Sequence, residues 1–172
     1  MRPWQYGFIL ATILAAACGS RRPVPSESPS LTAAQTATVQ ANVRTFAQAV
    51  AHDVTQDGPG AWRKHFSQSP SFFMVVEGHM AFPNSESATA GIRDFARTVQ
   101  RIELMWGDDL RVDPLASDLA VFASSYHEVR INTAGSRVDE DGFFTGIAEY
   151  REGHWQFRNA HWSSPVSAPR VQ

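Results

Sequence analysis

The chain has 172 residues, of which 43% are hydrophobic and 11% aromatic, so it is long enough to bury one sizeable core. Its 15 Lys and Arg residues nearly balance its 17 Asp and Glu residues, and neither sign forms a long run. Proteins that grip nucleic acid present a basic stripe to the phosphates, so no nucleic-acid partner is expected.

The first residues have the proportions of a secretory signal peptide. A positive start, Met1 and Arg2, precedes an uncharged apolar run over 7–17. That run is too short to cross about 30 Å of hydrocarbon, which takes roughly 20 helical residues. We therefore predict a signal peptide over residues 1–17 and export of the remainder.

Two processing routes are compatible with this signal. The three alanines at 15–17 fit a cleavage site that would release a secreted soluble protein, whereas residues 14–18 resemble a bacterial lipobox. Cys18 is the only cysteine in the chain and cannot form an internal disulfide, so lipidation would explain its presence. By resemblance to Gram-negative lipoproteins, Gly19 implies an outer-membrane lipoprotein of the cell envelope that faces the periplasm. Contact with the membrane is then expected through the lipid anchor alone.

A segment rich in Pro and Ser follows, with the sequence GSRRPVPSESPS at 19–30. It lacks apolar periodicity and cannot offset the entropy lost on ordering. We predict a disordered tether over 18–31 and a disordered tail over 166–172, on either side of one folded domain at 32–165.

The first half of this domain is predicted to be mostly helical. Thr32 and Gln35 have capping-box spacing, and apolar residues then recur every three or four positions up to Val54. This pattern predicts a long amphipathic helix that ends near the Gly-Pro-Gly sequence at 58–60. We expect three further elements next: a short helix over 61–66, a strand over 71–80, and a third helix with its apolar stripe between 88 and 99.

From Arg101 onward, apolar and polar residues alternate, which predicts strands over 101–113, 118–133, 143–151 and 154–163. Helices with one apolar stripe each must bury it against a sheet, and a long antiparallel sheet twists and curls. The predicted fold class is therefore α+β: a roll of three N-terminal helices packed on a strongly curved, mostly antiparallel sheet. Side chains cannot fill the wide end of such a cone, so a pocket is expected there.

Five short features carry a family resemblance. They are Trp62 four residues ahead of Phe66, the strand end Glu77-Gly78, the strand IELMW at 102–106, the run FFTG at 143–146, and the pattern Trp155…His161…Ser163. In this order they resemble the nuclear transport factor 2-like superfamily, specifically its SnoaL-like branch, over roughly residues 35–165. The resemblance implies a cystatin-like, nuclear transport factor 2-like α+β roll. It implies no single function, because isomerases, cyclases, dehydratases, ligand-binding modules and assembly domains share this scaffold.

The last predicted strand carries the first candidate catalytic residue. Strict alternation puts Trp155, Phe157, Asn159 and His161 on its helix-facing side, in order from the closed end of the cone to the mouth. An imidazole at the mouth could bind a ligand or transfer a proton near neutral pH. The alternative is a structural histidine that is hydrogen-bonded to a neighbouring element.

Glu77 and Tyr126 are further candidate catalytic residues. Glu77 shares a strand face with Phe73 and could be a buried carboxylate with a raised pKa, or it could lie at the exposed strand end. Tyr126 shares a face with Phe122 and could donate to an oxyanion, or it could be a core residue. The predicted ligand pocket comprises Trp62, Phe73, Glu77, Trp106, Tyr126, Phe157, Asn159 and His161.

No metal site and no cofactor are expected. The six histidines form no His-x-x-x-His pair and no Cys/His cluster, and residues 139–142 lack the spacing of a calcium loop. We interpret 139–142 as a solvated hairpin turn.

Three functions stay open. The first is a tethered module that binds a small apolar or amphipathic molecule in the pocket. The second is an assembly domain that forms a homodimer through the outer sheet face, where we place His154, Gln156, Arg158 and Trp162. The third, by resemblance to ketosteroid isomerase, is a cofactor-independent isomerase-, cyclase- or dehydratase-like enzyme that uses His161 with Glu77 or Tyr126.

Overall fold

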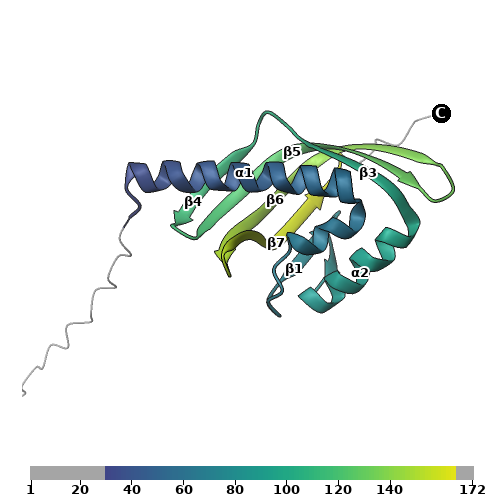
Figure 1. Cartoon of the computed structure of the whole chain (residues 1–172), viewed down its shortest axis with the longest axis horizontal. Coiled ribbons are helices and arrows are strands. Elements are labelled where there is room, and N and C mark those ends of the chain that lie inside the picture. Colours follow the sequence, from purple (N-terminus) through teal and green to yellow (C-terminus); the bar gives the residue numbers. More distant parts are fainter. Residues whose placement is uncertain (1–29, 166–172) are drawn as a thin grey trace, which may run out of the picture.

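The computed structural model describes residues 30–165. Within this range the elements are, in order, α1 (Ala33–Asp57), the 3-10 helix η1 (Pro59–Lys64), β1 (Phe73–Val76), β2 (His79–Phe82), α2 (Ser85–Thr98), β3 (Val99–Trp106), β4 (Arg111–Ala116), β5 (Leu119–Asn132), β6 (Arg137–Arg151) and β7 (His154–Ser163) (Figure 1). The predicted signal peptide, Cys18, nearly all of the tether and the tail lie outside the described residues. No helix within 30–165 has both the length and the apolar character needed to cross a membrane.

Helix α1 forms because its sequence specifies both ends and one buried face. At the start, Thr32 Oγ1 accepts a hydrogen bond from Gln35 N at 3.2 Å, and Gln35 Oε1 accepts one from Thr32 N at 2.9 Å, which is the predicted capping box. At the end, Gly58 adopts a φ of 79°, which favours glycine. The buried face of the helix consists of Val39, Val43, Phe46, Ala47, Val50 and Val54.

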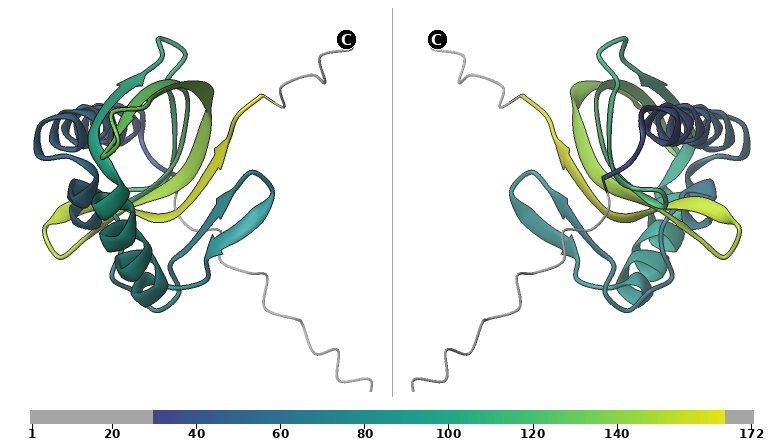
Figure 2. Two further views of the ribbon diagram at one scale, coloured as in Figure 1. Left: turned by 90° about the vertical axis from the view of Figure 1, so that its right-hand side faces the viewer. Right: turned by 90° about the vertical axis from the view of Figure 1, so that its left-hand side faces the viewer.

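The strands within 30–165 form one seven-stranded sheet in the order β2-β1-β7-β6-β5-β3, and β4 also pairs with β5. β1 runs parallel to β7, whereas the other pairs in this sheet are antiparallel. The long strands curl around the side on which α1 lies (Figure 2). The predicted α+β roll is therefore confirmed.

The strand expected over 71–80 is a hairpin instead. β1 and β2 pair with each other, and the chain reverses at Glu77 and Gly78, whose φ angles are 50° and 76°. Two consecutive positive φ angles are typical of the two-residue turns that match the twist of a hairpin. Glu77 therefore lies in a turn and not on a strand.

The strand expected over 101–113 is also wrong in extent, because it is divided into β3 and β4. The two strands pair with different halves of β5. In the connection between them, Asp109 Oδ1 accepts hydrogen bonds from Ser125 N at 2.9 Å and Ser125 Oγ at 2.7 Å. These bonds hold the connection against the middle of β5.

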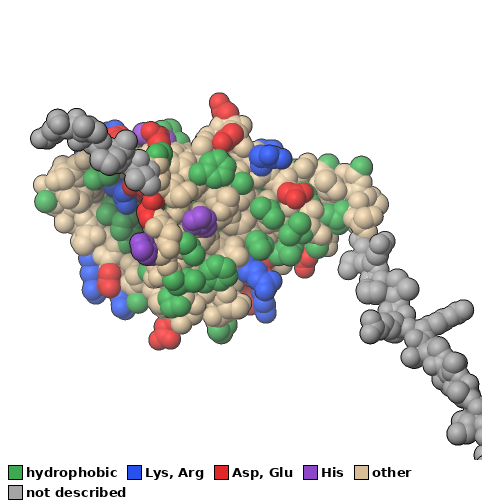
Figure 3. Space-filling view, turned by 180° about the vertical axis from the view of Figure 1, so that it is seen from behind, with side chains coloured by type: hydrophobic (Ala, Val, Ile, Leu, Met, Phe, Trp, Pro, Cys, Tyr) green, Lys and Arg blue, Asp and Glu red, His purple; other side chains and the backbone are tan. Residues whose placement is uncertain are grey.

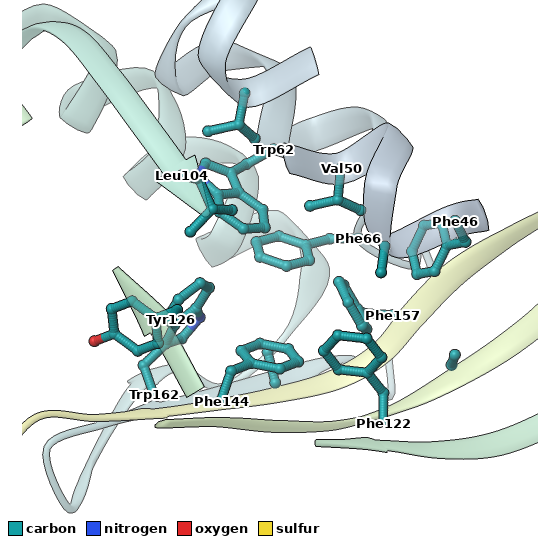
Figure 4. Close-up of a cluster of buried hydrophobic side chains, with 14 of the residues drawn as sticks. Phe46, Val50, Trp62, Phe66, Leu104, Phe122, Tyr126, Phe144, Phe157 and Trp162 are labelled. Carbon is teal, nitrogen blue, oxygen red and sulfur yellow. The ribbon is translucent and has the colours of Figure 1, made fainter. Parts of the chain in front are cut away.

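Aromatic side chains fill the interior between α1 and the sheet (Figure 4). Phe122, Phe144 and Phe157 come from three neighbouring strands, are fully buried, and have ring centroids between 4.9 and 5.6 Å apart. The Trp106 indole N–H donates a hydrogen bond to Ala47 O at 2.8 Å. Two further hydrogen bonds join α1 to the sheet, from Leu104 N to Thr55 Oγ1 at 3.1 Å and from Gln40 Nε2 to Val112 O at 3.3 Å, so both apolar packing and hydrogen bonds fix the sheet to the helix.

Candidate functional site

A cavity of about 290 Å³ lies between η1, the β1–β2 hairpin, α2 and the inner face of β5, β6 and β7. Most of its wall is apolar and is formed by Trp62, Phe66, Phe82, Ile92, Phe95 and Trp162. Its polar end is formed by Tyr126, Glu128, Arg130 and Glu140. The cavity is therefore an aromatic pocket with one cluster of polar and charged side chains.

Two neighbouring strands build the polar end. Tyr126, Glu128 and Arg130 are alternate residues of β5, so their side chains share the inner face of the sheet. Glu140 lies opposite Glu128 on β6. Tyr126 Oη donates a hydrogen bond to Glu140 Oε1 at 3.0 Å, and Arg130 Nη2 is ion-paired with Glu140 Oε2. The register of β5 and β6 therefore holds the four groups together.

Tyr126 reaches this position because Gly142 lies opposite it on β6. A Cβ at Gly142 would lie 2.4 Å from Tyr126 Oη and 2.4 Å from Ser163 O. The Tyr126 ring packs edge-on against Trp162 at a centroid distance of 4.7 Å, and its hydroxyl points away from the aromatic cluster (Figure 4). Burial raises the pKa of this phenol, so Tyr126 stays a hydrogen-bond donor at neutral pH.

Glu128 is the most perturbed carboxyl of the site. It is 8% exposed, and burial raises its pKa to about 7; Arg130 opposes this rise and Glu140 adds to it. Arg130 Nε lies 3.2 Å from Glu128 Oε1, yet this N–H has no acceptor at hydrogen-bond geometry within 30–165. We therefore treat the contact as a charge pair and not as a hydrogen bond. No residue in the described range donates a hydrogen bond to the Glu128 carboxyl.

Glu77 lies at the edge of this cluster and not inside the cavity. Its side chain is exposed, and Glu77 Oε1 accepts hydrogen bonds from Ser164 N and from Ser164 Oγ, the latter at 2.9 Å. Ser164 Oγ is also 2.6 Å from Glu140 Oε1. Because a hydroxyl has one proton, Ser164 donates to one of the two carboxylates at a time. Of the two alternatives for Glu77, the exposed position is therefore the one found, and the buried base is wrong, since the hairpin turn places the side chain at the surface.

The prediction that His161 and Asn159 point into the pocket is also wrong. β6 and β7 change register at Arg158, which has no partner on β6. Such a β-bulge reverses the alternation of side chains. Phe157 faces the core as expected, but beyond the bulge Trp162 faces the cavity while Asn159 and His161 face the outside of the sheet.

The other predicted pocket residues divide into three groups. Trp62 and Tyr126 line the cavity. Trp106 and Phe157 belong to the core that packs on α1 and do not line the cavity. Phe73 lies on the outer face of β1 and is 39% exposed, because the hairpin turns its neighbour Met74 inward.

The predicted dimer face is wrong for two of its four residues. His154 and Arg158 are exposed. Gln156 is 5% exposed, and its Nε2 donates a hydrogen bond to Glu149 Oε1 at 3.4 Å. Trp162 lines the cavity because the bulge turns it inward.

The outer face of the sheet carries a different surface from the one predicted. It has a shallow groove of about 420 Å³, lined in part by Phe73, Val75, Val121, Thr145, Ile147 and His161. Figure 3 shows the molecule from the side opposite to α1, with hydrophobic side chains over the middle of this face. Asn159 helps to hold the bulge, because its Oδ1 accepts a hydrogen bond from Ile147 N at 2.9 Å.

Sequence reasoning missed three of the four polar residues of the cavity. Glu128 and Arg130 continue the alternation that places Tyr126 on the inner face, so the period-two pattern could have found them. Glu140 was assigned to a solvated turn at 139–142, but β6 begins at Arg137 and includes it. Within the described range, no group of three or more His, Cys, Asp or Glu side chains could hold a metal ion.

Comparison with known proteins identifies the fold. No family model and no curated protein sequence matches the chain. Among solved structures, a nuclear transport factor 2-like superfamily protein from Salmonella enterica serovar Typhimurium is similar, with a TM-score of 0.65 and 12% identity over 79% of this chain and 97% of that one.

Two further structures are similar. A protein with a cystatin-like fold from Caulobacter vibrioides has a TM-score of 0.58 and 15% identity, over 74% of this chain and 89% of that one. A hexachlorocyclohexane dehydrochlorinase from Novosphingobium barchaimii has a TM-score of 0.56 and 14% identity, over 73% and 86%. The chain therefore has the nuclear transport factor 2-like, or cystatin-like, fold, as its short sequence features indicated.

Proposed function

We propose that this domain binds a small, mostly apolar molecule in the 290 Å³ cavity, with the polar end of the ligand against Glu128. The observation that supports this most is the contrast within the cavity, whose aromatic wall ends in one partly buried cluster of polar groups. Ligand sites are typically apolar pockets in which a few placed polar groups fix the orientation of the ligand. The cavity is at the small end of that class, which favours a ligand of one or two rings.

A fluorescent probe tests this proposal directly. Prodan, a neutral naphthalene ketone, has two rings and brightens in apolar surroundings. Val76→Phe places a larger side chain on the cavity wall, whereas Val75→Phe makes the same change one residue earlier, on the opposite face of β1. We expect Val76→Phe to weaken probe binding by at least about tenfold and Val75→Phe to leave it unchanged. Equal binding by the two variants would mean that the cavity is not the site.

Proton transfer is a second candidate function, favoured by the state of Glu128. A general acid or base works best when its pKa lies near the working pH, and burial raises the pKa of Glu128 to about 7. This role replaces the predicted one for His161, which lies on the other face of the sheet. Indanone, a flat ketone with exchangeable α-hydrogens, should take up deuterium faster with the wild type than with Glu128→Gln. Equal exchange rates would contradict a role of Glu128 in proton transfer.

We also propose that the outer sheet face forms a homodimer, through residues other than those predicted. The register of β1, β7, β6 and β5 places eleven side chains on the middle of this face, and none is Lys, Arg, Asp or Glu. They are Phe73, Val75, Val121, Ala123, Ser125, Phe143, Thr145, Ile147, Asn159, His161 and Ser163. Arg111 and Asp113 of β4 lie at the border of this face. Interface cores are depleted in charge and enriched in aromatic residues, and an uncharged patch can face its own copy without repulsion.

Two aromatic residues of β6 provide a matched test of the homodimer. Phe143 is 42% exposed, lies in the middle of β6 and belongs to the uncharged face, whereas Tyr150 is 48% exposed and lies near the C-terminal end of the same strand. We expect Phe143→Glu to halve the mass measured by light scattering and Tyr150→Glu to leave it unchanged. A monomeric wild type would contradict the proposal.

For location, we propose export and a lipid anchor at Cys18, on the support of the sequence pattern at 14–18. Cys18→Ser should move the protein from the membrane fraction to the soluble fraction of the cell envelope. A wild type that is already soluble would favour the secreted form.

A further inference from the structure

When Glu128 is ionised, the polar end of the cavity holds more negative than positive charge. Glu128 and Glu140 both line it, and the Ser164 hydroxyl lies within hydrogen-bond distance of both Glu140 and Glu77. Among the described residues of the lining, Arg130 is the one cation, and it is ion-paired with Glu140 and 3.2 Å from Glu128. An anionic ligand would meet repulsion at this end, whereas a cationic one would reduce the excess charge.

The Glu128 carboxyl is a buried acceptor that faces this cavity without a donor. It is 8% exposed, and no residue within 30–165 donates a hydrogen bond to it. A buried acceptor without a donor is costly, and it is satisfied best by a ligand that brings donors of its own. An ammonium group offers up to three N–H donors and no acceptor.

The rings beside this carboxyl favour the same kind of ligand. Trp162 meets Tyr126 and Trp62 edge-on, with ring centroids 4.7 and 5.4 Å away. All three rings line the cavity, and the faces of such rings attract cations, those of tryptophan most strongly. We infer that the cavity takes an amphipathic amine, in which a flat apolar group lies among the rings and a positively charged nitrogen contacts Glu128. This inference rests on the proposed small-molecule function and names the chemical class of its ligand.

An amine ligand makes binding depend on pH. Because burial raises the pKa of Glu128 to about 7, this carboxyl is largely protonated in mildly acidic solution. The titratable groups that face Glu128 are Arg130 and Tyr126 on its own strand and Glu140 on β6. On the other side, β3 places Leu104 opposite Glu128. The residues of α2, η1, the hairpin and β7 that line the cavity are apolar. A cation binds the ionised carboxyl more tightly, so amine affinity should rise with pH up to about 7 and then level off.

Three ligands with one ring system separate charge from shape. Naphthylethylamine, naphthylethanol and naphthylacetate carry a cationic, a neutral and an anionic end group. Calorimetric titration at about pH 5.5 and about pH 8, where the amine stays protonated, gives a Kd for each. At the higher pH we expect the amine to bind at least about tenfold more tightly than the alcohol, and the acetate most weakly. Amine affinity should fall at least about tenfold at the lower pH, whereas alcohol affinity should not change.

Two variants assign the result to the cavity and to its carboxyl. Glu128→Gln keeps the shape of the side chain and should make amine binding independent of pH and no tighter than alcohol binding. Val76→Phe should weaken the amine and the alcohol alike, with Val75→Phe as its matched control.

The outcomes separate this inference from the function on which it rests. If the alcohol binds as tightly as the amine, or if the pH dependence persists in Glu128→Gln, the amine inference is overturned, although the cavity stays a ligand site as long as Val76→Phe blocks it. If none of the three ligands binds, or if Val76→Phe weakens none of them, both the inference and the proposed function are overturned.

Discussion

Replacing Glu128 by glutamine should remove a loss of stability that the wild type suffers as the pH rises through neutrality. The carboxyl is 8% exposed, and its pKa is raised by burial from an ordinary 4.5 to about 7 in the folded state. Between these two values the folded chain keeps a proton that the unfolded chain has released. Stability therefore falls as the pH rises, because the folded state binds more protons than the unfolded state.

The size of this effect follows from the two pKa values. A difference of about 2.5 pKa units, at about 1.4 kcal/mol each, corresponds to about 3 kcal/mol of unfolding free energy. The stabilising contribution is complete below about pH 4.5 and is lost above about pH 7. Three kcal/mol is a large share of the 5–15 kcal/mol that typically separates a folded domain from its unfolded state.

Urea denaturation followed by tryptophan fluorescence, at a series of pH values, measures the effect as a difference between two proteins. Between about pH 4.5 and pH 8, the unfolding free energy of Glu128→Gln should rise by about 3 kcal/mol relative to that of the wild type. This expected change does not depend on how far the two stabilities differ at low pH. Glu152→Gln, at an exposed turn, is the control for loss of one carboxylate charge. If the curves of the wild type and Glu128→Gln run parallel over this range, the carboxyl titrates normally and the reasoning about the polar end is refuted.

Three further substitutions test the packing that positions the site, each by urea denaturation. Gly142→Ala should cost about 1–3 kcal/mol of unfolding free energy, since the added Cβ would lie 2.4 Å from both Tyr126 Oη and Ser163 O. An unchanged stability would mean that β6 can move away from β5 and β7 without cost. Phe157→Ala should cost about 3–5 kcal/mol, because it empties a fully buried position among other rings, and a loss below about 1 kcal/mol would contradict a tightly packed core. Thr32→Ala should cost only about 1 kcal/mol by removing the cap of α1, and a glycine at the same position should cost less.

Sequence predicts well those parts of the fold in which apolar residues recur at one regular spacing along the chain. The capping box at Thr32 and the apolar stripe of α1 follow from helical spacing and are found as expected. The period of two along β5 places Phe122 and Tyr126 correctly on the inner face, and its continuation leads to Glu128 and Arg130. Three of the four residues of the polar end were therefore within reach of the sequence, had the alternation been followed to the end of the strand.

The wrong predictions concern places where a bulge or a turn of the backbone interrupts this regular spacing. The bulge at Arg158 reverses the faces of all later residues of β7, and neither a glycine nor a proline marks it. One unpaired residue thus moved His161 out of the predicted pocket and Trp162 into it. The turn at Glu77 differs, because Gly78 marks it just as Gly153 marks the turn at 152–153, but the prediction joined the residues on its two sides into one continuous strand.

The position of the last strand within the sheet constrains the order of folding. β7 lies between β1 and β6, and Phe73–Val76 pair with residues 159–162. The β1–β2 hairpin therefore has no strand edge to join until almost the whole domain has been synthesised, and such distant pairings are slow to form. A nascent chain that stops short of His154 lacks the strand that joins the two parts of the sheet, so the final ten residues of the sheet complete the assembly.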